Sequence, residues 1–291
     1  MKHNWPVTFV LCTLFLLAQV IGLVVIQSYI DTAMTAETGE IAWKPLPAIA
    51  GYSMARPEAT PGASVVYILL ALLFGTILIL LIVHWQKVVL WKVWFWLAVF
   101  LCLHIAFSAF MQARYAAVLA LVLSLIKILK PNVLVHNITE LFIYAGLAVI
   151  FVPLLTPLTA IILLVLISGY DMYAVWKSQH MARMAQFQAK SGIFAGLLLP
   201  YAPKKIIVTK KDVKAGQVRT AILGGGDIGF PLIFAGVVMK SIGFQPALLI
   251  AAGATAALLG LLWFGQKKRF YPAMPFLTAG CLAGYALTFL W

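Results

Sequence analysis

Two carboxyl groups fall inside long apolar stretches of the chain, and they are the side chains best suited to chemistry there. The sequence has eight acidic residues, of which four fall in one polar connection, Asp212 in another, and Glu140 at the expected water-facing start of an apolar segment. Only Asp171 and Asp227 are left within apolar segments. Burying a carboxyl in hydrocarbon costs roughly 2.5–3.5 kcal/mol on insertion scales, so an acid in such a place predicts a functional site.

Both aspartates are expected near the same membrane surface. Asp171 lies five residues before an apolar segment ends at Trp176, and Asp227 lies six residues after the next one begins at Ala221. At a rise of about 1.5 Å per residue, each is roughly 8–9 Å from its helix end. Two close carboxyls in a low-dielectric site share one proton, so one can accept a proton from water while the other polarises a carbonyl. The pair therefore suits aspartyl hydrolysis of a peptide bond.

Other chemistries find little support. The five histidines contain no HExxH pair, which excludes zinc proteases of that type. The three cysteines lie in apolar runs without metal-ligand spacing. Gly224-x-Gly226-x-x-Gly229 fits a dinucleotide-binding pattern, but it follows no strand of a βαβ unit. We therefore expect no metal and no cofactor, and these glycines to allow close backbone approach of a neighbouring helix or of a substrate.

The elements that must position the two acids are membrane helices. The chain is 64% hydrophobic and 10% charged, with a mean hydropathy of +1.02. Soluble domains have about 45–50% apolar and about 25% charged residues. The net charge of +13 lies mostly in the connections, where it indicates orientation and lipid contact rather than nucleic-acid binding. The expected fold class is all-α, a polytopic protein of the lipid bilayer.

Nine segments approach the roughly 17–25 residues that a spanning helix needs. A polar turn is expected between the fourth and fifth segments, because the polar residues and the proline found there would be costly in hydrocarbon. These residues are Lys127, Lys130, Pro131, Asn132, His136 and Asn137. The segments are 7–29, 64–83, 93–112, 115–129, 141–155, 158–176, 221–239, 244–264 and 274–291.

Basic residues fall on alternate connections between these segments. With the N-terminus inside, 17 of the 21 Lys and Arg residues lie on the cytoplasmic side, as the positive-inside rule requires. We therefore expect a multi-pass protein of the cell membrane, with a cytoplasmic N-terminus and an extracytoplasmic C-terminus. It would form one membrane domain, with helices one to six in residues 1–176, a cytoplasmic loop in 177–220 and helices seven to nine in 221–291.

Three short motifs in the second half of the chain resemble those of a known family. Gly169-Tyr170-Asp171, Gly224-Gly225-Gly226-Asp227 and Pro272-Ala273-Met274-Pro275 are similar to the YD, GxGD and PAL motifs of presenilin and signal peptide peptidase relatives. The resemblance implies a presenilin-like fold of nine transmembrane helices, with Asp171 and Asp227 as catalytic residues. It also implies an active-site border and substrate-binding region formed by Tyr170, Gly224, Gly225, Gly226, Pro272, Ala273 and Met274. Met274 replaces the usual leucine, which has a similar volume.

A second copy of the third motif must be set aside. Gln245-Pro246-Ala247-Leu248 matches its letters, but it is expected at the outer end of its segment, across the membrane from the aspartates. The motif at Pro272 is expected on the inner side, at their level. We therefore expect the Pro272 motif to border the site.

The resemblance also indicates activity and partners. It implies an intramembrane aspartic endopeptidase that cleaves transmembrane helices of other membrane proteins. The compact chain is most like archaeal presenilin homologues, so no obligatory accessory subunit is expected, and a homo-oligomer is left open. The N-in, C-out orientation is that of presenilins, which favours substrates whose N-terminus lies outside.

Two other functions would also place acids within apolar segments. A proton-coupled transporter or channel predicts an inverted repeat and acids spread across the membrane depth, and the sequence shows neither. A prepilin-type peptidase also carries GxGD, but it usually follows the aspartate with a lysine-containing stretch that Ile228-Gly229-Phe230 lacks.

A strand is expected directly before the seventh segment. Residues 217–221 are rich in β-formers and lead towards Asp227, and residues 206–209 could pair with them. A substrate helix must unwind before cleavage, and its freed backbone groups then need partners. Residues 217–221 are therefore expected to offer a strand edge to the unwound substrate.

Overall fold

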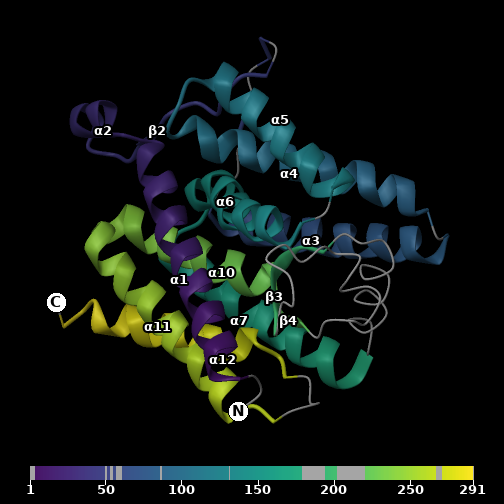
Figure 1. Ribbon diagram of the computed structural model, residues 1–291. Helices are drawn as coiled ribbons and strands as arrows, with labels where there is room; N and C mark the ends of the chain where they lie inside the picture. The colour runs from purple at the N-terminus through teal and green to yellow at the C-terminus, as the bar shows by residue number, and fades with distance from the viewer. Residues whose placement is uncertain are drawn as a thin grey trace.

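The computed structural model describes residues 4–49, 51–52, 55–56, 61–85, 87–130, 132–178, 194–201, 220–266 and 271–290, and these are mostly helical (Figure 1). The long helices are α1 (Trp5–Ser28), α3 (Pro61–His84), α4 (Val88–Ser108), α5 (Ala113–Leu129), α6 (Val133–Phe151), α7 (Pro157–Tyr173), α10 (Gly225–Ile242), α11 (Phe244–Phe264) and α12 (Met274–Leu287). The short elements are β1 (Ile30–Asp31), α2 (Thr32–Thr38), β2 (Ala42–Trp43), the 3-10 turn η1 (Val152–Leu154), the π-helical turn η2 (Ala174–Ser178), β3 (Gly196–Pro200) and β4 (Thr220–Gly224).

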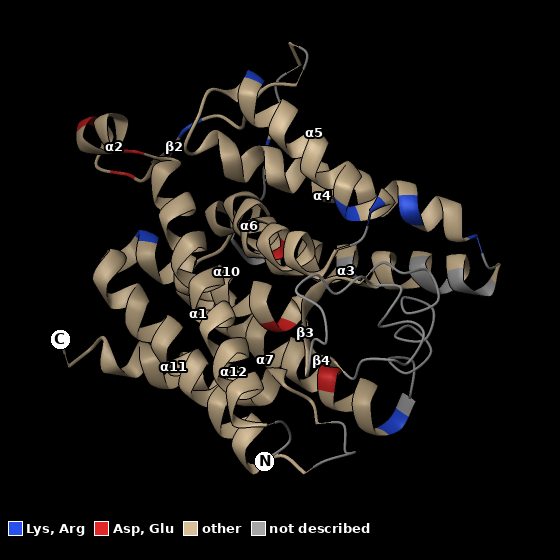
Figure 2. Cartoon of the chain, in the orientation of Figure 1, with Lys and Arg blue, Asp and Glu red and all other residues tan. Residues whose placement is uncertain are grey.

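A helix lies in each of the nine apolar segments, within the ranges that the structure describes. Six of these helices are long and apolar enough to cross a membrane: α1, α4, α6, α7, α10 and α11. In the described residues, α12 and the stretch Ala63–Leu78 of α3 are apolar but shorter, and α5 has 17 residues. Charged positions are scarce along the ribbons (Figure 2). The chain is therefore a multi-pass helical membrane protein. That all nine helices cross the membrane stays a prediction.

Helices α1, α6 and α10 pack against one another in the middle of the bundle (Figure 1). Helices α4 and α5 pack on α6, whereas α11 packs on α1, α10 and α12. The α11–α12 contact brings the two backbones together, because a Cβ at Gly280 would lie 2.4 Å from the carbonyl oxygen of Gly253. Small residues at such contacts are typical of membrane helices, which associate through close packing rather than through apolar burial.

The expected polar turn between the fourth and fifth segments is wrong for most of its residues. Helix α6 already begins at Val133, with Asn132 as its N-cap, and His136, Asn137 and Glu140 lie buried in its first two turns. Lys127 lies buried in the last turn of α5. The physical reason is that these polar groups bind one another and the backbone of β3, so they do not need water.

The expected start of the seventh segment at Ala221 is also wrong. Residues 220–224 form β4, which pairs antiparallel with β3, and the helix begins only at Gly225. Of the expected strand 217–221, only Thr220 and Ala221 are described, and they belong to β4. Its expected partner, 206–209, lies outside the described residues, and the partner that the structure shows is Gly196–Pro200. Asp227 is therefore the third residue of its helix.

Candidate active site

Asp171 lies near the end of α7, where its carboxylate meets the start of another helix. It is half-buried, and its Oδ2 accepts a hydrogen bond from the backbone N–H of Met274 at 3.1 Å. Met274 is the first residue of α12, so this N–H has no partner within its own helix. The positive end of the α12 dipole also favours a negative group at this position.

A second contact fixes the register of α7 and α12. The hydroxyls of Ser168 and Thr278 lie 2.8 Å apart, one turn beyond the contact between Asp171 and Met274. The two helices therefore run antiparallel with the Pro272 motif beside Asp171, where Pro272 and Met274 are buried. The copy at Pro246 lies instead in the first turn of α11.

Asp227 lies in the first turn of α10, directly after β4. It is half-buried, and a Cβ on Gly224 would lie 3.1 Å from its Oδ2. The strand pairing determines how this helix begins, since the N–H of Gly225 donates to the carbonyl of Ala195 at 3.2 Å. An acid at the N-terminus of a helix is stabilised by the helix dipole.

The helix ends that carry the three motifs come together. Helices α7, α10 and α12 pack pairwise. Lys240, near the end of α10, donates to the carbonyl of Val152 at 3.0 Å, shortly before α7 begins. The end of α10 is thus near the start of α7, so the two helices run antiparallel. Asp227, at the start of α10, therefore lies towards the end of α7 that carries Asp171. This end of the three-helix group is the candidate site.

The remaining motif residues have different surroundings. Tyr170 is 53% exposed, next to Asp171. A Cβ on Gly225 would lie 2.6 Å from the hydroxyl of Tyr144, so the ring of Tyr144 approaches the α10 backbone closely. Gly226 is exposed, and a Cβ there would be in ordinary contact with the ring of Phe230 at 3.6 Å. Of the three motif glycines, Gly225 is the one held by a neighbouring helix.

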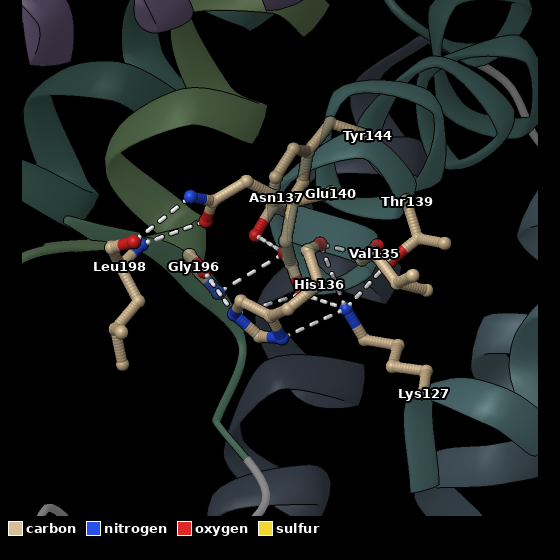
Figure 3. Close-up of polar contacts among 9 residues, drawn as sticks. All are labelled: Lys127, Val135, His136, Asn137, Thr139, Glu140, Tyr144, Gly196 and Leu198. Carbon is tan, nitrogen blue, oxygen red and sulfur yellow. Dashed lines mark hydrogen bonds and ion pairs between the residues drawn. The ribbon is translucent and has the colours of Figure 1, made fainter. Parts of the chain in front are cut away.

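Side chains of α6 close one edge of β3 (Figure 3). Gly196 donates its N–H to Glu140 Oε2 at 3.0 Å, and its carbonyl contacts His136 Nε2 at 2.8 Å. Asn137 accepts the N–H of Leu198 at 3.0 Å and donates to its carbonyl at 2.8 Å, as a neighbouring strand would. Alternate residues of a strand direct their backbone groups to the same edge. The N–H and C=O groups of Leu197 and Leu199 therefore face β4.

The sequence interpretation missed these α6 residues. The sequence predicts Glu140 at a water boundary, but its side chain is 1% exposed and thus more buried than either aspartate. A signal was present, since His136, Glu140 and Tyr144 are spaced by four residues and so lie on one face of a helix. A hydropathy profile does not reveal this signal, because it assigns each charged residue a free-energy cost of burial without considering the residue that pairs with it.

A helical membrane protein with two half-buried aspartates at neighbouring helix ends fits the class of intramembrane aspartyl proteases. A family model described as signal-peptide peptidase, presenilin aspartyl protease matches residues 12–291. The chain therefore belongs to this family and is an aspartic endopeptidase of the intramembrane type, which confirms the resemblance of its motifs.

Solved structures agree on the fold. One presenilin family intramembrane aspartate protease, in a C222 crystal form, has a TM-score of 0.62 and 18% identity, covering 98% of this chain and 99% of that chain. A second, in a P2 form, has a TM-score of 0.61 and 21% identity, covering 96% of each. A comparison with curated protein sequences finds no match.

Proposed function

We propose that Asp171 and Asp227 form the catalytic pair of this protease and hydrolyse peptide bonds within transmembrane helices of other proteins. The observation that carries the proposal is the meeting of α7, α10 and α12, with Asp171 bound to the first N–H of α12 and Asp227 in the first turn of α10. The border of the site would be formed by Tyr170, Gly224, Gly225, Gly226, Pro272, Ala273 and Met274.

The reaction would proceed by general acid–base catalysis. The pair holds one proton between its carboxyls, since two adjacent carboxylates repel each other. The ionised carboxylate takes a proton from a water molecule, whose oxygen attacks the scissile carbonyl carbon. The protonated carboxyl donates to the carbonyl oxygen, which gives a tetrahedral diol. The carboxyl that is now protonated then donates to the leaving nitrogen as the C–N bond breaks, while the other carboxylate takes a proton from one hydroxyl of the diol, so that a carboxylic acid is released and the pair again holds one proton. The N–H of Met274 holds Asp171 Oδ2 and so orients this carboxyl.

The substrate would bind as an extended strand beside β4. One edge of β3 is occupied by α6, so the β3–β4 pair can grow only at the outer edge of β4. Ala221 and Leu223 face β3, which directs the backbone groups of Ile222 outward, and Ile222 is 52% exposed. An unwound helix in hydrocarbon must satisfy its freed backbone groups, and the edge of β4, which ends directly before α10, provides partners.

The proposed orientation places this site near the cytoplasmic surface, in a nine-helix protein whose substrates have an outside N-terminus. Trp5 at the start of α1 packs edge-on against Trp263 near the end of α11, with ring centroids 4.9 Å apart. The N-terminus and the basic connection after α11 thus belong to the same end of the bundle. Tryptophans at helix ends are also typical of the membrane interface.

The test is cleavage of a helical membrane substrate by the purified protein, with and without a transition-state aspartyl inhibitor. Asp171→Asn and Asp227→Asn should each lower the cleavage rate by about 10²–10⁴-fold, because general acid–base catalysis contributes that much. Asp31→Asn is the matched control: this residue caps α2 through its side chain, a role that asparagine also fills. Wild-type cleavage by Asp227→Asn would refute the proposal.

A further inference from the structure

Lys127 and Glu140 form a buried ion pair that the proposed reaction does not use. Lys127 Nζ lies 2.7 Å from Glu140 Oε1, and both side chains are 1% exposed. Lys127 also donates to the hydroxyl of Thr139 at 2.9 Å and to the backbone carbonyl of His136 at 3.3 Å. A buried ion pair gives little net stability relative to an apolar pair of similar volume. Stability alone therefore does not explain why charges lie here.

His136 connects the ion pair to β3 (Figure 3). Its Nδ1 lies 3.1 Å from Lys127 Nζ, and its Nε2 lies 2.8 Å from the carbonyl oxygen of Gly196. An ammonium group only donates and a carbonyl only accepts, so a neutral ring with its proton on Nε2 satisfies both. Polar contacts thus run without interruption from α5 through α6 to β3.

Tyr144 connects the same carboxylate to α10. Its hydroxyl donates to Glu140 Oε2, the oxygen that also accepts from the N–H of Gly196. Its ring lies along the start of α10. A Cβ added at Gly225 would lie 2.6 Å from Tyr144 Oη, and one added at Gly229 would lie 3.6 Å from Tyr144 Cδ1. Gly225 is two residues before Asp227.

We propose that Lys127, Glu140 and Tyr144 are positioning residues for Asp227. Glu140 is the centre of the arrangement: one oxygen binds Lys127, and the other binds both the strand that pairs with β4 and the tyrosine that packs on α10. The contact with Lys127 orients the carboxylate, so both other contacts are made from one fixed point. The inference rests on the proposed function, because the position of Asp227 matters only if Asp227 is catalytic.

The first test compares Tyr144→Phe with Tyr29→Phe. Each loses one buried hydroxyl that donates a hydrogen bond, in the control to the carbonyl of Ile105 at 2.7 Å. Both should lower thermal stability to a similar extent. Tyr144→Phe should lower kcat by about 10- to 100-fold with KM within about twofold, because a catalytic group displaced by ~1 Å loses rate by about that factor. Tyr29→Phe should leave both constants unchanged.

The second test neutralises the ion pair with the double variant Lys127→Met and Glu140→Gln. The new side chains have similar lengths and no charge, so the fold should keep a stability close to that of wild type. The amide oxygen can still accept from Gly196 and Tyr144, but the other end of the group loses the ammonium of Lys127 that fixes it, so these two contacts are no longer made from a fixed point. We expect a fall in kcat comparable to that of Tyr144→Phe.

Asp227→Asn, measured alongside, separates the two proposals. If it abolishes cleavage while Tyr144→Phe and the double variant keep wild-type kcat, the positioning inference is overturned and the proposed function stands. If Asp227→Asn still cleaves, the proposed function fails and the inference falls with it. A loss of kcat in both network variants, with a normal Tyr29→Phe, is the result that we expect.

Discussion

Replacing Gly225 by alanine tests the fit between Tyr144 and the start of α10. The new Cβ would lie 2.6 Å from Tyr144 Oη and 3.1 Å from its Cε1, whereas ordinary contact begins at 3.4 Å. The gap must widen by about 0.8 Å, the difference between 3.4 and 2.6 Å. The ring is held by the bond from its hydroxyl to Glu140. We therefore expect the first turn of α10, with Asp227, to move.

The expected loss of rate follows from this displacement. A misplacement of ~1 Å costs about 10²-fold in rate, so we expect kcat to fall by about 10- to 100-fold, equivalent to about 1.4–2.7 kcal/mol of activation free energy. Overpacking should also lower the free energy of unfolding by about 1–3 kcal/mol. The measurements are initial rates on a helical membrane substrate and thermal unfolding in detergent.

A control and a rescue make the test specific. Gly260 in α11 has nothing within 4 Å of a built Cβ, so Gly260→Ala should leave kcat unchanged. In the double variant Gly225→Ala and Tyr144→Leu, the shorter side chain leaves room for the new methyl group, so the combined loss should be smaller than the sum of the two single losses. Wild-type kcat in Gly225→Ala, or losses that add in full, would refute the reasoning.

Two further predictions concern the substrate and the orientation. Ile222→Pro removes an N–H that faces away from β3, so it should sharply reduce cleavage of helical substrates and leave binding of a small active-site inhibitor nearly unchanged. Ile222→Ala keeps that N–H and should cleave much better, and equal loss in both variants would contradict strand addition. The native cysteines are buried, so Ser191→Cys should react with an impermeant thiol reagent only from the cytoplasmic side, and Thr38→Cys only from outside. The reverse pattern would overturn the orientation.

Much of the fold could be predicted because the hydropathy of a segment depends only on the residues within that segment. The helices α1, α3, α4 and α11 lie within a few residues of their expected segments. A helix in hydrocarbon bonds its own backbone, so its location needs little information from its neighbours. The motifs around Asp171 and Asp227 were equally visible, since an acid in an apolar segment is a local anomaly.

The boundary between β4 and α10 shows where local reasoning fails. Residues 221–224 read as the start of an apolar helix, yet they form a strand because Gly196–Pro200 offers them a partner. Gly196 itself has φ +137, and a Cβ there would lie 2.1 Å from the carbonyl oxygen of Leu223, so only glycine allows the strands to meet in this way. No pattern within residues 220–227 contains that information.

The sequence by itself determined that the chain is a helical membrane protein, which segments are helical, and which two acids are unusual. The tertiary structure alone decided that Glu140 faces Lys127 and β3 rather than water. Its partners are 13 and 56 residues away in the chain and on other elements. A charge in an apolar setting is costly alone and acceptable when paired. Pairing between helices depends on how the helices pack, and that packing cannot be read from the sequence of one segment.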